Sequence, residues 1–227
     1  MIKLRTLLHE SESIFVQRRS KEERQKKYAA ELNNVIKHYS KQSPEYFKEH
    51  PEKIDLNLSK LNFEPKLPDN LTVYGNLDLY DTPITSLPSG LEVGESLWLH
   101  NTPITSLPSG LEVGSDLDLT NTPITSLPSG LEVGRDLRLE NTPITSLPSD
   151  LKVGGNLDLN NTPIKELPDN LEVGGYLDLN YTPITSLPSD LKVGRDLHLE
   201  NTPISKKYTK EQVKKMLPNV NGRIYVW

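Results

Sequence analysis

The sequence predicts an elongated solenoid whose stacked turns share one parallel β-sheet. Between residues 67 and 206 the chain repeats itself seven times, with a constant period of 20 residues. A fixed period of this length is typical of repeat architectures, in which each unit buries its apolar side chains against its neighbours. Within each unit a Leu-x-Leu segment has the alternation of a half-buried strand, and two prolines leave no room for a helix.

Each unit opens on a Leu-Pro pair, and the seven leucines are Leu67, Leu87, Leu107, Leu127, Leu147, Leu167 and Leu187. In the unit of residues 87–106, Leu97 and Leu99 form the predicted strand. They become buried only if a copy lies on either side, so seven strands at about 4.8 Å spacing make a face roughly 34 Å long. Leu91 and Val93 repeat the alternation and are expected to line the opposite wall of the same core.

The pattern Leu97-x-Leu99-x-x-Thr102-x-Ile104 resembles that of the leucine-rich repeat family, with threonine where the family has asparagine. The Leu-Pro-x-x-Leu element is similar to the short repeats of its bacterial and phage-type members. The resemblance implies a leucine-rich repeat solenoid with one strand per repeat and a non-helical convex wall. A threonine hydroxyl replaces only part of the hydrogen bonding of an asparagine amide, so the curvature stays open. A flatter, two-walled β-solenoid is the alternative.

The segment before the array is expected to cap its open core. Residues 20–53 are predicted to be a helical N-terminal cap, because Ser20–Glu23 is a capping box and apolar residues then recur at helical spacing. Residues 54–66 look like a degenerate first repeat, with Leu56 and Leu58 as its strand. The seven regular repeats then follow.

The last segment, residues 207–227, is predicted to cap the other end of the array. Thr209–Gln212 is a second capping box and predicts the start of a helix. Arg223–Trp227 alternates as a strand does and is expected to close the sheet. The predicted C-terminal cap is therefore a helix followed by a strand.

Residues 1–19 fit no cap and are interpreted as a basic arm or a leader. The apolar residues before Glu10 resemble the leader of proteins packaged into tailed-phage heads, and Leu8-His9-Glu10 matches the Leu-x-Glu triplet after which such leaders are cut. A secretory signal is not expected, because the apolar stretch is short and lacks a small-residue cleavage site. Whether residues 1–10 are removed is not decided by the sequence.

Charge is distributed unevenly along the chain. Residues 1–66 contain 14 Lys and Arg and 10 Asp and Glu, a net charge of +4. Residues 67–206 contain 7 and 20, a net charge of −13, and residues 207–227 contain 5 and 1, again a net charge of +4. So negative an array repels phosphate backbones, which argues against nucleic acid as its ligand. No apolar run approaches the length of a membrane span. The expected partner is therefore a protein with a basic surface, and the oligomeric state stays open.

No residue pattern typical of catalysis is present, so we expect no enzyme, cofactor or metal site. There is no cysteine, and the five histidines do not stand at metal-ligand spacing. Asp158 and Asp178 are predicted to be neighbours, but Trp98 and Arg138 interrupt their column and no glycine-rich loop completes a calcium site. The missing cysteine fits a reducing compartment, the cytoplasm of a bacterium or phage-infected host, with the virion as the alternative.

The repeats differ from one another mainly on the exposed side of the predicted strands. The varied positions are the column between the two strand leucines and the next column outward. The flanking positions before the strand add Arg135, Arg195 and Tyr176. Trp98, beside Tyr80 and His100, is the leading anchor, because Trp and Tyr dominate interface hot spots. The predicted partner-binding residues are Tyr80, Trp98, His100, Asp118, Arg138, Asp158, Tyr176, Asp178 and His198.

These features favour a non-enzymatic protein-binding scaffold that uses the exposed strand face. One alternative is a phage virion-associated or assembly component, in which the array is a spacer and the basic ends make the contacts. Another is a carbohydrate-binding module that uses the Trp, Tyr, Asp and Asn side chains of the same face. Loss of residues 1–10 from the mature protein would favour the virion alternative, and glycan binding that requires Trp98 would favour the carbohydrate alternative.

Overall fold

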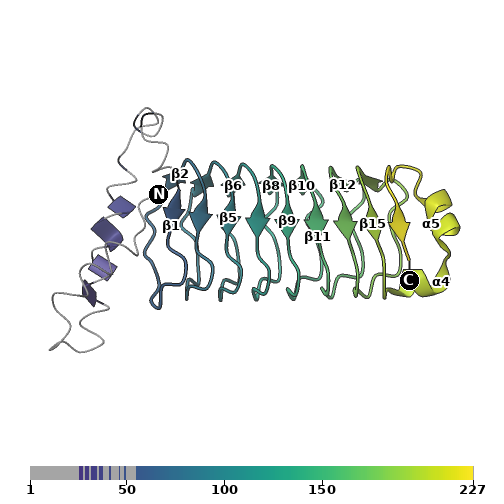
Figure 1. The fold of residues 1–227 in the computed structure, drawn as a ribbon, viewed down its shortest axis with the longest axis horizontal. Helices are drawn as coiled ribbons and strands as arrows, with labels where there is room; N and C mark the ends of the chain where they lie inside the picture. The colour runs from purple at the N-terminus through teal and green to yellow at the C-terminus, as the bar shows by residue number, and fades with distance from the viewer. Residues whose placement is uncertain are drawn as a thin grey trace.

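The computed structural model describes residues 55–226 and, before them, residues 26, 27, 29, 30, 32–34, 36, 37, 41, 46 and 49. The predicted arm or leader and the Ser20–Glu23 capping box lie outside the described residues. Figure 1 shows the array as a row of turns stacked side by side along one axis, with α4 and α5 at its C-terminal end.

The larger sheet contains nine parallel strands in chain order, with one strand from each regular repeat. This confirms the predicted leucine-rich solenoid with one such strand per repeat. Partners along the array are 20 residues apart. The exceptions lie at the two ends, where Leu56 pairs with Leu77 because the degenerate unit has one extra residue, and Leu197 pairs with Ile224 of the cap. The strands are β1 (Leu56–Asn57), β3 (Leu77–Asp78), β5 (Leu97–Trp98), β7 (Leu117–Asp118), β9 (Leu137–Arg138), β11 (Leu157–Asp158), β13 (Leu177–Asp178), β15 (Leu197–His198) and β16 (Ile224–Tyr225).

A second parallel sheet of seven strands forms the opposite wall. The sequence predicts that the Leu91-x-Val93 segments line this wall, but it predicts a single sheet. In each strand the valine points into the core, and in the six strands after β2 the residue before it is an exposed glutamate or lysine. This wall is therefore extended and not helical, as expected. The strands are β2 (Thr72–Val73), β4 (Glu92–Val93), β6 (Glu112–Val113), β8 (Glu132–Val133), β10 (Lys152–Val153), β12 (Glu172–Val173) and β14 (Lys192–Val193).

One continuous hydrophobic core runs between the two sheets. Leu97, Leu99 and Ile104 are completely buried, and their equivalents recur along the array. Each fully buried leucine or isoleucine contributes about 1.5–3 kcal/mol relative to an exposed one. Leu32 and Ile36, which lie among the described helical residues before the array, are also buried and join this core. Stacking of near-identical units therefore supplies most of the apolar contact.

The C-terminal cap consists of α4 (Pro203–Lys207), α5 (Lys210–Met216) and β16. Thr209 caps α5 with both bonds of a capping box, as predicted, and β16 pairs with β15. The expectation that no helix forms inside a unit is wrong for the last one, because Pro203 of its Thr-Pro-Ile segment begins α4. In the other units the Leu-Pro pair of the next unit follows Thr-Pro-Ile, but here Lys207 and Tyr208 take its place. Ser205 also completes a capping box with Thr202. The helical cap thus begins four residues before residue 207.

Candidate partner-binding surface

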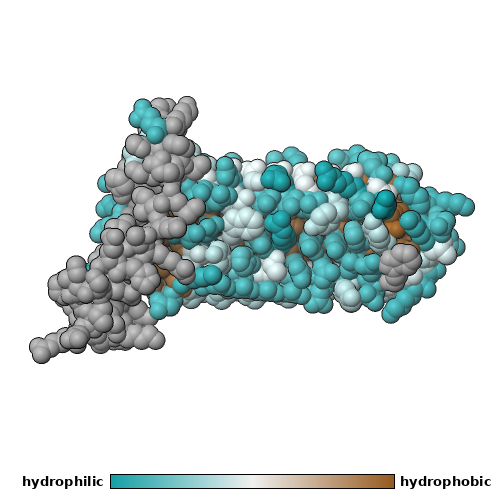
Figure 2. Space-filling view, viewed as in Figure 1, coloured by the Kyte–Doolittle hydropathy of each residue, from teal (hydrophilic) through white to brown (hydrophobic). Residues whose placement is uncertain are grey.

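The exposed side of the nine-stranded sheet, here called the strand face, carries the predicted site residues. In-register pairing places the residue between the two leucines of each unit in one line. Figure 2 shows the molecule as mainly hydrophilic in this view, with pale areas among the teal ones. From end to end, the central column is Asn57, Asp78, Trp98, Asp118, Arg138, Asp158, Asp178, His198 and Tyr225.

The N-terminal half of the strand face contains interlocked rings and cations. The rings of Tyr80 and His100 are stacked, with centroids 4.6 Å apart and planes 9° from parallel. The guanidinium of Arg138 lies 5.7 Å from the centroid of the Trp98 ring. Trp98 is half-buried and therefore offers a partner only part of its surface. The leading anchor is thus held in place before any partner arrives.

Asp118 lies beneath this cluster and is only 8% exposed. Its Oδ1 accepts a hydrogen bond of 2.9 Å from the N–H of Thr120, and its Oδ2 lies 3.6 Å from Nδ1 of His100. Arg138 donates to Asp136 at 3.1 Å and lies 3.7 Å from Asp116. Asp118 therefore supplies negative charge to the strand face but little contact area.

The C-terminal half of the strand face combines carboxylates with aromatic rings. Asp158 and Asp178 lie in direct register on β11 and β13. Burial raises the pKa of both carboxyls, although hydrogen bonds from the following N–H groups act in the opposite direction. His198 meets the edge of the Tyr176 ring at 6.1 Å and stacks on Tyr225 at 4.6 Å. This half is thus acidic, aromatic and partly dehydrated.

A series of side-chain hydrogen bonds, here called the entry ladder, runs along the residues that precede the strands. In each step a side-chain oxygen accepts the backbone N–H of the equivalent residue one repeat later, as Asp136 does from Asn156 at 2.9 Å. The series is interrupted at Tyr176, whose side chain offers no such oxygen to the N–H of Asp196. It resumes at Asp196, whose Oδ1 accepts the N–H of Arg223 at 2.8 Å. Its acceptors before the interruption are Asp55, Asn76, Ser96, Asp116, Asp136 and Asn156.

A second series, here called the exit ladder, links the turns that follow the strands. Its residues have φ between 55° and 58°, the left-handed region that Asn and Asp tolerate best. Each asparagine amide donates to the equivalent side chain one repeat earlier, at 2.7–3.0 Å. The members are Asp81, Asn101, Asn121, Asn141 and Asn161.

Tyr181 takes the next position of the exit ladder and interrupts it. It keeps the left-handed backbone, with φ 58°, and its side chain is 60% exposed. A left-handed conformation costs a non-glycine residue about 1–2 kcal/mol, and each lost hydrogen bond costs about 0.5–1.5 kcal/mol. Tyr181 is not among the residues predicted from the sequence, although one tyrosine in a column of Asp and Asn is a visible signal. The prediction was confined to the strand columns and their flanks, and it did not include the backbone of the turn.

The opposite wall has grooves but little variation between repeats. One groove, of about 930 Å³, runs over β2 to β10 and includes Gly94, Gly114 and Gly134 in its lining. Glu132 and Lys152 pair across two neighbouring strands beside it. The glycines are needed because a Cβ at Gly114 would overlap the carbonyl oxygen of Gly94. The groove is therefore a consequence of the way the repeats stack.

No group of three or more potential ligands among the described residues is placed to hold a metal ion. In the same part of the chain, no helix is long and apolar enough to cross a bilayer. The chemistry that the strand face offers is therefore that of aromatic, carboxylate and guanidinium side chains.

Comparison with known proteins supports the fold and leaves the function open. No protein-family model and no curated protein matches the sequence. Among solved structures, the leucine-rich repeat domain of a Shigella effector is similar with a TM-score of 0.54 and 20% identity, over 88% of this chain and 96% of that chain. At this identity the likeness shows a shared fold, and that fold is the leucine-rich repeat solenoid.

Proposed function

We propose that this leucine-rich repeat solenoid is a non-enzymatic scaffold that binds a partner protein through its strand face. One observation carries the proposal: the repeats hold their core and turn residues nearly constant and change their side chains on this face. If the array served only as a spacer, exposed positions elsewhere in the unit would vary as much. The variation is therefore concentrated at exposed positions of the strand face, whose side chains do not form the core.

The chemistry of the face favours a partner with a basic surface. Residues 67–206 carry 7 Lys and Arg against 20 Asp and Glu, a net charge of −13. A field of that sign attracts cationic proteins and accelerates their association. Half-buried Trp98 and the stacked pair of Tyr80 and His100 are held by contacts within the protein, so they lose little freedom on binding.

Quantitative affinity purification with the full chain as bait tests the proposal. Trp98→Ala and Arg138→Ala remove the two partners of the cation–π contact, while Glu112→Ala removes an exposed charge from the opposite wall. We expect a protein that the wild type and Glu112→Ala retain equally and that each strand-face variant retains about tenfold less, the size of a typical hot-spot loss. Circular dichroism should show that all four proteins are folded.

Equal capture by the wild type and both strand-face variants would contradict the proposal. Binding on a glycan array that depends on Trp98, without a protein partner, would instead favour the carbohydrate alternative. Incorporation into virions that is insensitive to both substitutions would favour the structural alternative. These outcomes separate the three functions because each places the contact on different side chains.

A further inference from the structure

The strand β13 departs from the rest of the array at both of its ends. Before it, Tyr176 interrupts the entry ladder, and after it, Tyr181 ends the exit ladder. Both departures replace a short polar side chain by tyrosine, and both occur in one repeat out of seven. Tyr176 and Tyr181 are here called the tyrosine pair. Asn201, one repeat beyond, makes no exit-ladder bond in the described structure, so the interruption reaches the next unit.

A third unfavourable feature lies between the two tyrosines. Asp158 and Asp178 are the one pair of carboxylates in direct register along the central column of the described strands. Like charges directly opposite each other destabilise a sheet. On their outer sides Asp158 has Arg138 and Asp178 has His198 as direct neighbours. The other acidic residues of the column have no acidic direct neighbour among the described strands. Three local losses of stability thus meet at β11 and β13.

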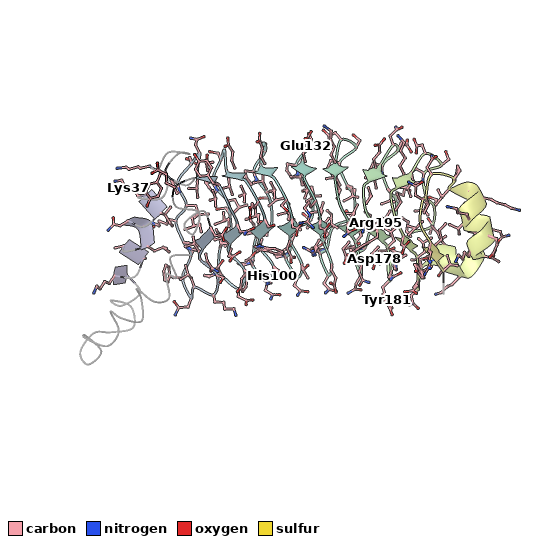
Figure 3. The ribbon with its side chains drawn as sticks, turned by 45° about the horizontal axis from the view of Figure 1, so that its top comes forward. Lys37, His100, Glu132, Asp178, Tyr181 and Arg195 are labelled. Carbon is pink, nitrogen blue, oxygen red and sulfur yellow. The ribbon has the colours of Figure 1, made fainter. Side chains whose placement is uncertain are left out.

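Features that disobey local rules tend to mark functional positions in proteins. Here the three features bring aromatic rings and carboxylates into one repeat and its neighbour. Tyr181 is the most exposed large apolar side chain among the described residues. Tyr176 is half-buried, and the charges of Asp158 and Asp178 act on its hydroxyl. Figure 3 labels Asp178 between Arg195 and Tyr181 across the width of the array. The result is a pair of carboxylates on neighbouring strands, with one tyrosine before and one after the strand that carries Asp178.

We infer that the tyrosine pair and the two carboxylates between them form the docking surface for an extended, arginine-containing segment of a partner protein. The planar guanidinium pairs with carboxylates through parallel hydrogen bonds and stacks on aromatic faces, which a lysine ammonium does less well. Tyr176 and Tyr181 are five residues apart in the chain. That separation spans at most about 17 Å, the length of a short extended segment. This inference rests on the proposed function and names the class of partner.

The charge of the array supports this occupant. The neighbouring strand-face carboxylates, Glu140 and Glu200, add to the negative charge around Asp158 and Asp178. Asn180 and Glu200 bond to each other through both backbone and side chain, at 2.6 and 3.2 Å, and so keep that rim fixed. A cationic segment would offset the like-charge repulsion that the empty surface retains.

Variants that restore the ladders test the inference with the full chain. Tyr176→Asn and Tyr181→Asn change no charge at neutral pH, and each supplies the side-chain oxygen or amide that its ladder lacks. We expect each to raise Tm by about 2–4 °C. The double variant should bind a fluorescent peptide of alternating glycine and arginine at least about tenfold more weakly than the wild type in an anisotropy titration. A matched lysine peptide should bind the wild type more weakly than the arginine peptide.

A charge control separates this surface from general attraction. Glu92→Gln with Glu112→Gln removes two charges from the opposite wall and should change arginine-peptide affinity less than about twofold. Unchanged peptide affinity in the double tyrosine variant would overturn the inference, as would a larger loss in the wall variant. If Trp98→Ala still abolishes partner capture in that case, the proposed function survives without the tyrosine pair. If no strand-face variant affects capture, the proposed function itself fails.

Discussion

At the scale of the residue, two neighbouring side chains share the work of holding each turn. The hydroxyl of Thr102 donates to the carbonyl of Leu99 at 2.7 Å inside its own repeat, and its equivalents do the same at 2.6–2.7 Å. A threonine has one proton to donate, so it cannot also link the repeats. Asn101 provides that link by donating to Asp81. The threonine pattern therefore depends on an asparagine one residue earlier.

The carboxyl of Asp178 yields a prediction about pH. Burial raises its pKa in the folded protein, so the folded state binds this proton more readily than the unfolded state. The free energy of unfolding therefore falls as pH rises from the ordinary carboxyl pKa through the raised one, and stays lower above it. Asp178→Asn keeps an oxygen for the N–H of Asn180 and should raise Tm at pH 7. The gain should shrink towards pH 4, and calorimetry at both pH values measures it.

A lower Tm for Asp178→Asn at pH 7 would show that the carboxylate stabilises the fold. It would then be better paired than its burial and its neighbours Asp158 and Glu200 suggest. A carboxyl with a raised pKa is charged at pH 7 and largely neutral at pH 4. A gain in Tm of the same size at both pH values would therefore show that the charge of Asp178 is not the cause.

Sequence patterns located most of the candidate surface but not its fine structure. Periodicity of two places Trp98, Asp158 and Asp178 on one exposed column, because alternate residues of a strand share a face. This periodicity does not show how much of each side chain its neighbours cover. It therefore includes Asp118 among the partner-binding residues, although Asp118 is nearly buried. Nor does it give the left-handed turn at Tyr181, which depends on backbone geometry after the strand.

At the scale of the element, the two sheets differ in the contact that limits how closely their strands stack. The strands of the larger sheet require leucines that pack, such as Leu117 and Leu137. The six strands of the smaller sheet after β2 are each followed by a glycine, over which the preceding turn passes closely. A Cβ at Gly134 would overlap the carbonyl oxygen of Gly114 one repeat earlier. Stacking on this wall is therefore limited by backbone contact between turns.

Two glycines four residues apart provide a matched test of this limit. Gly130 has φ 72° but nothing within 4 Å of an added Cβ, whereas Gly134 has no such space. Gly130→Ala should lower the free energy of unfolding by about 1–2 kcal/mol through backbone conformation alone. Gly134→Ala must separate two turns and should cost more, about 3 kcal/mol or above. Chemical denaturation of both variants compares them, and equal losses would contradict close backbone contact as the limit.

The end elements show where a repeat pattern predicts less well. The helix α5 was predicted because Thr209 and Gln212 form a capping box that is visible in the sequence. The helix α4 was not, because Pro203 also belongs to the repeated Thr-Pro-Ile segment, which is not helical in the six other regular units. The residues after the proline decide the outcome, since Ser205 completes a cap and no second Leu-Pro pair stops the helix.

At the scale of the whole molecule, a regular stack allows different parts of one face to act independently. The aromatic and cationic cluster of Tyr80, Trp98 and Arg138 lies on β3 to β9, and the tyrosine pair lies around β13. In a solenoid each unit contacts only its neighbours, so stability is close to a sum over units and their interfaces. A change in one part should therefore leave distant units almost unaffected.

Deletion of residues 107–126 tests this independence. It removes one complete unit and joins Ser106 to Leu127, so every remaining turn keeps its leucine register. We expect a folded protein with one cooperative transition and a lower Tm, because one interface between repeats is lost. Affinity for the arginine peptide should stay within about twofold of the wild type, since the tyrosine pair keeps its neighbours. Circular dichroism, calorimetry and anisotropy measure these three properties.

Deletion of residues 107–116 is the matched control. It removes half a unit, so the strand that begins at Leu117 would come directly after Ser106 without the Leu-Pro and Leu-x-Val segments that form the opposite wall. The core would then lose its second wall at that turn, and we expect a larger fall in Tm or loss of the cooperative transition. If the complete-unit deletion were as damaging as the half-unit deletion, the repeats would not be interchangeable. The differences between their strand faces would then belong to folding, and they would no longer mark a binding surface.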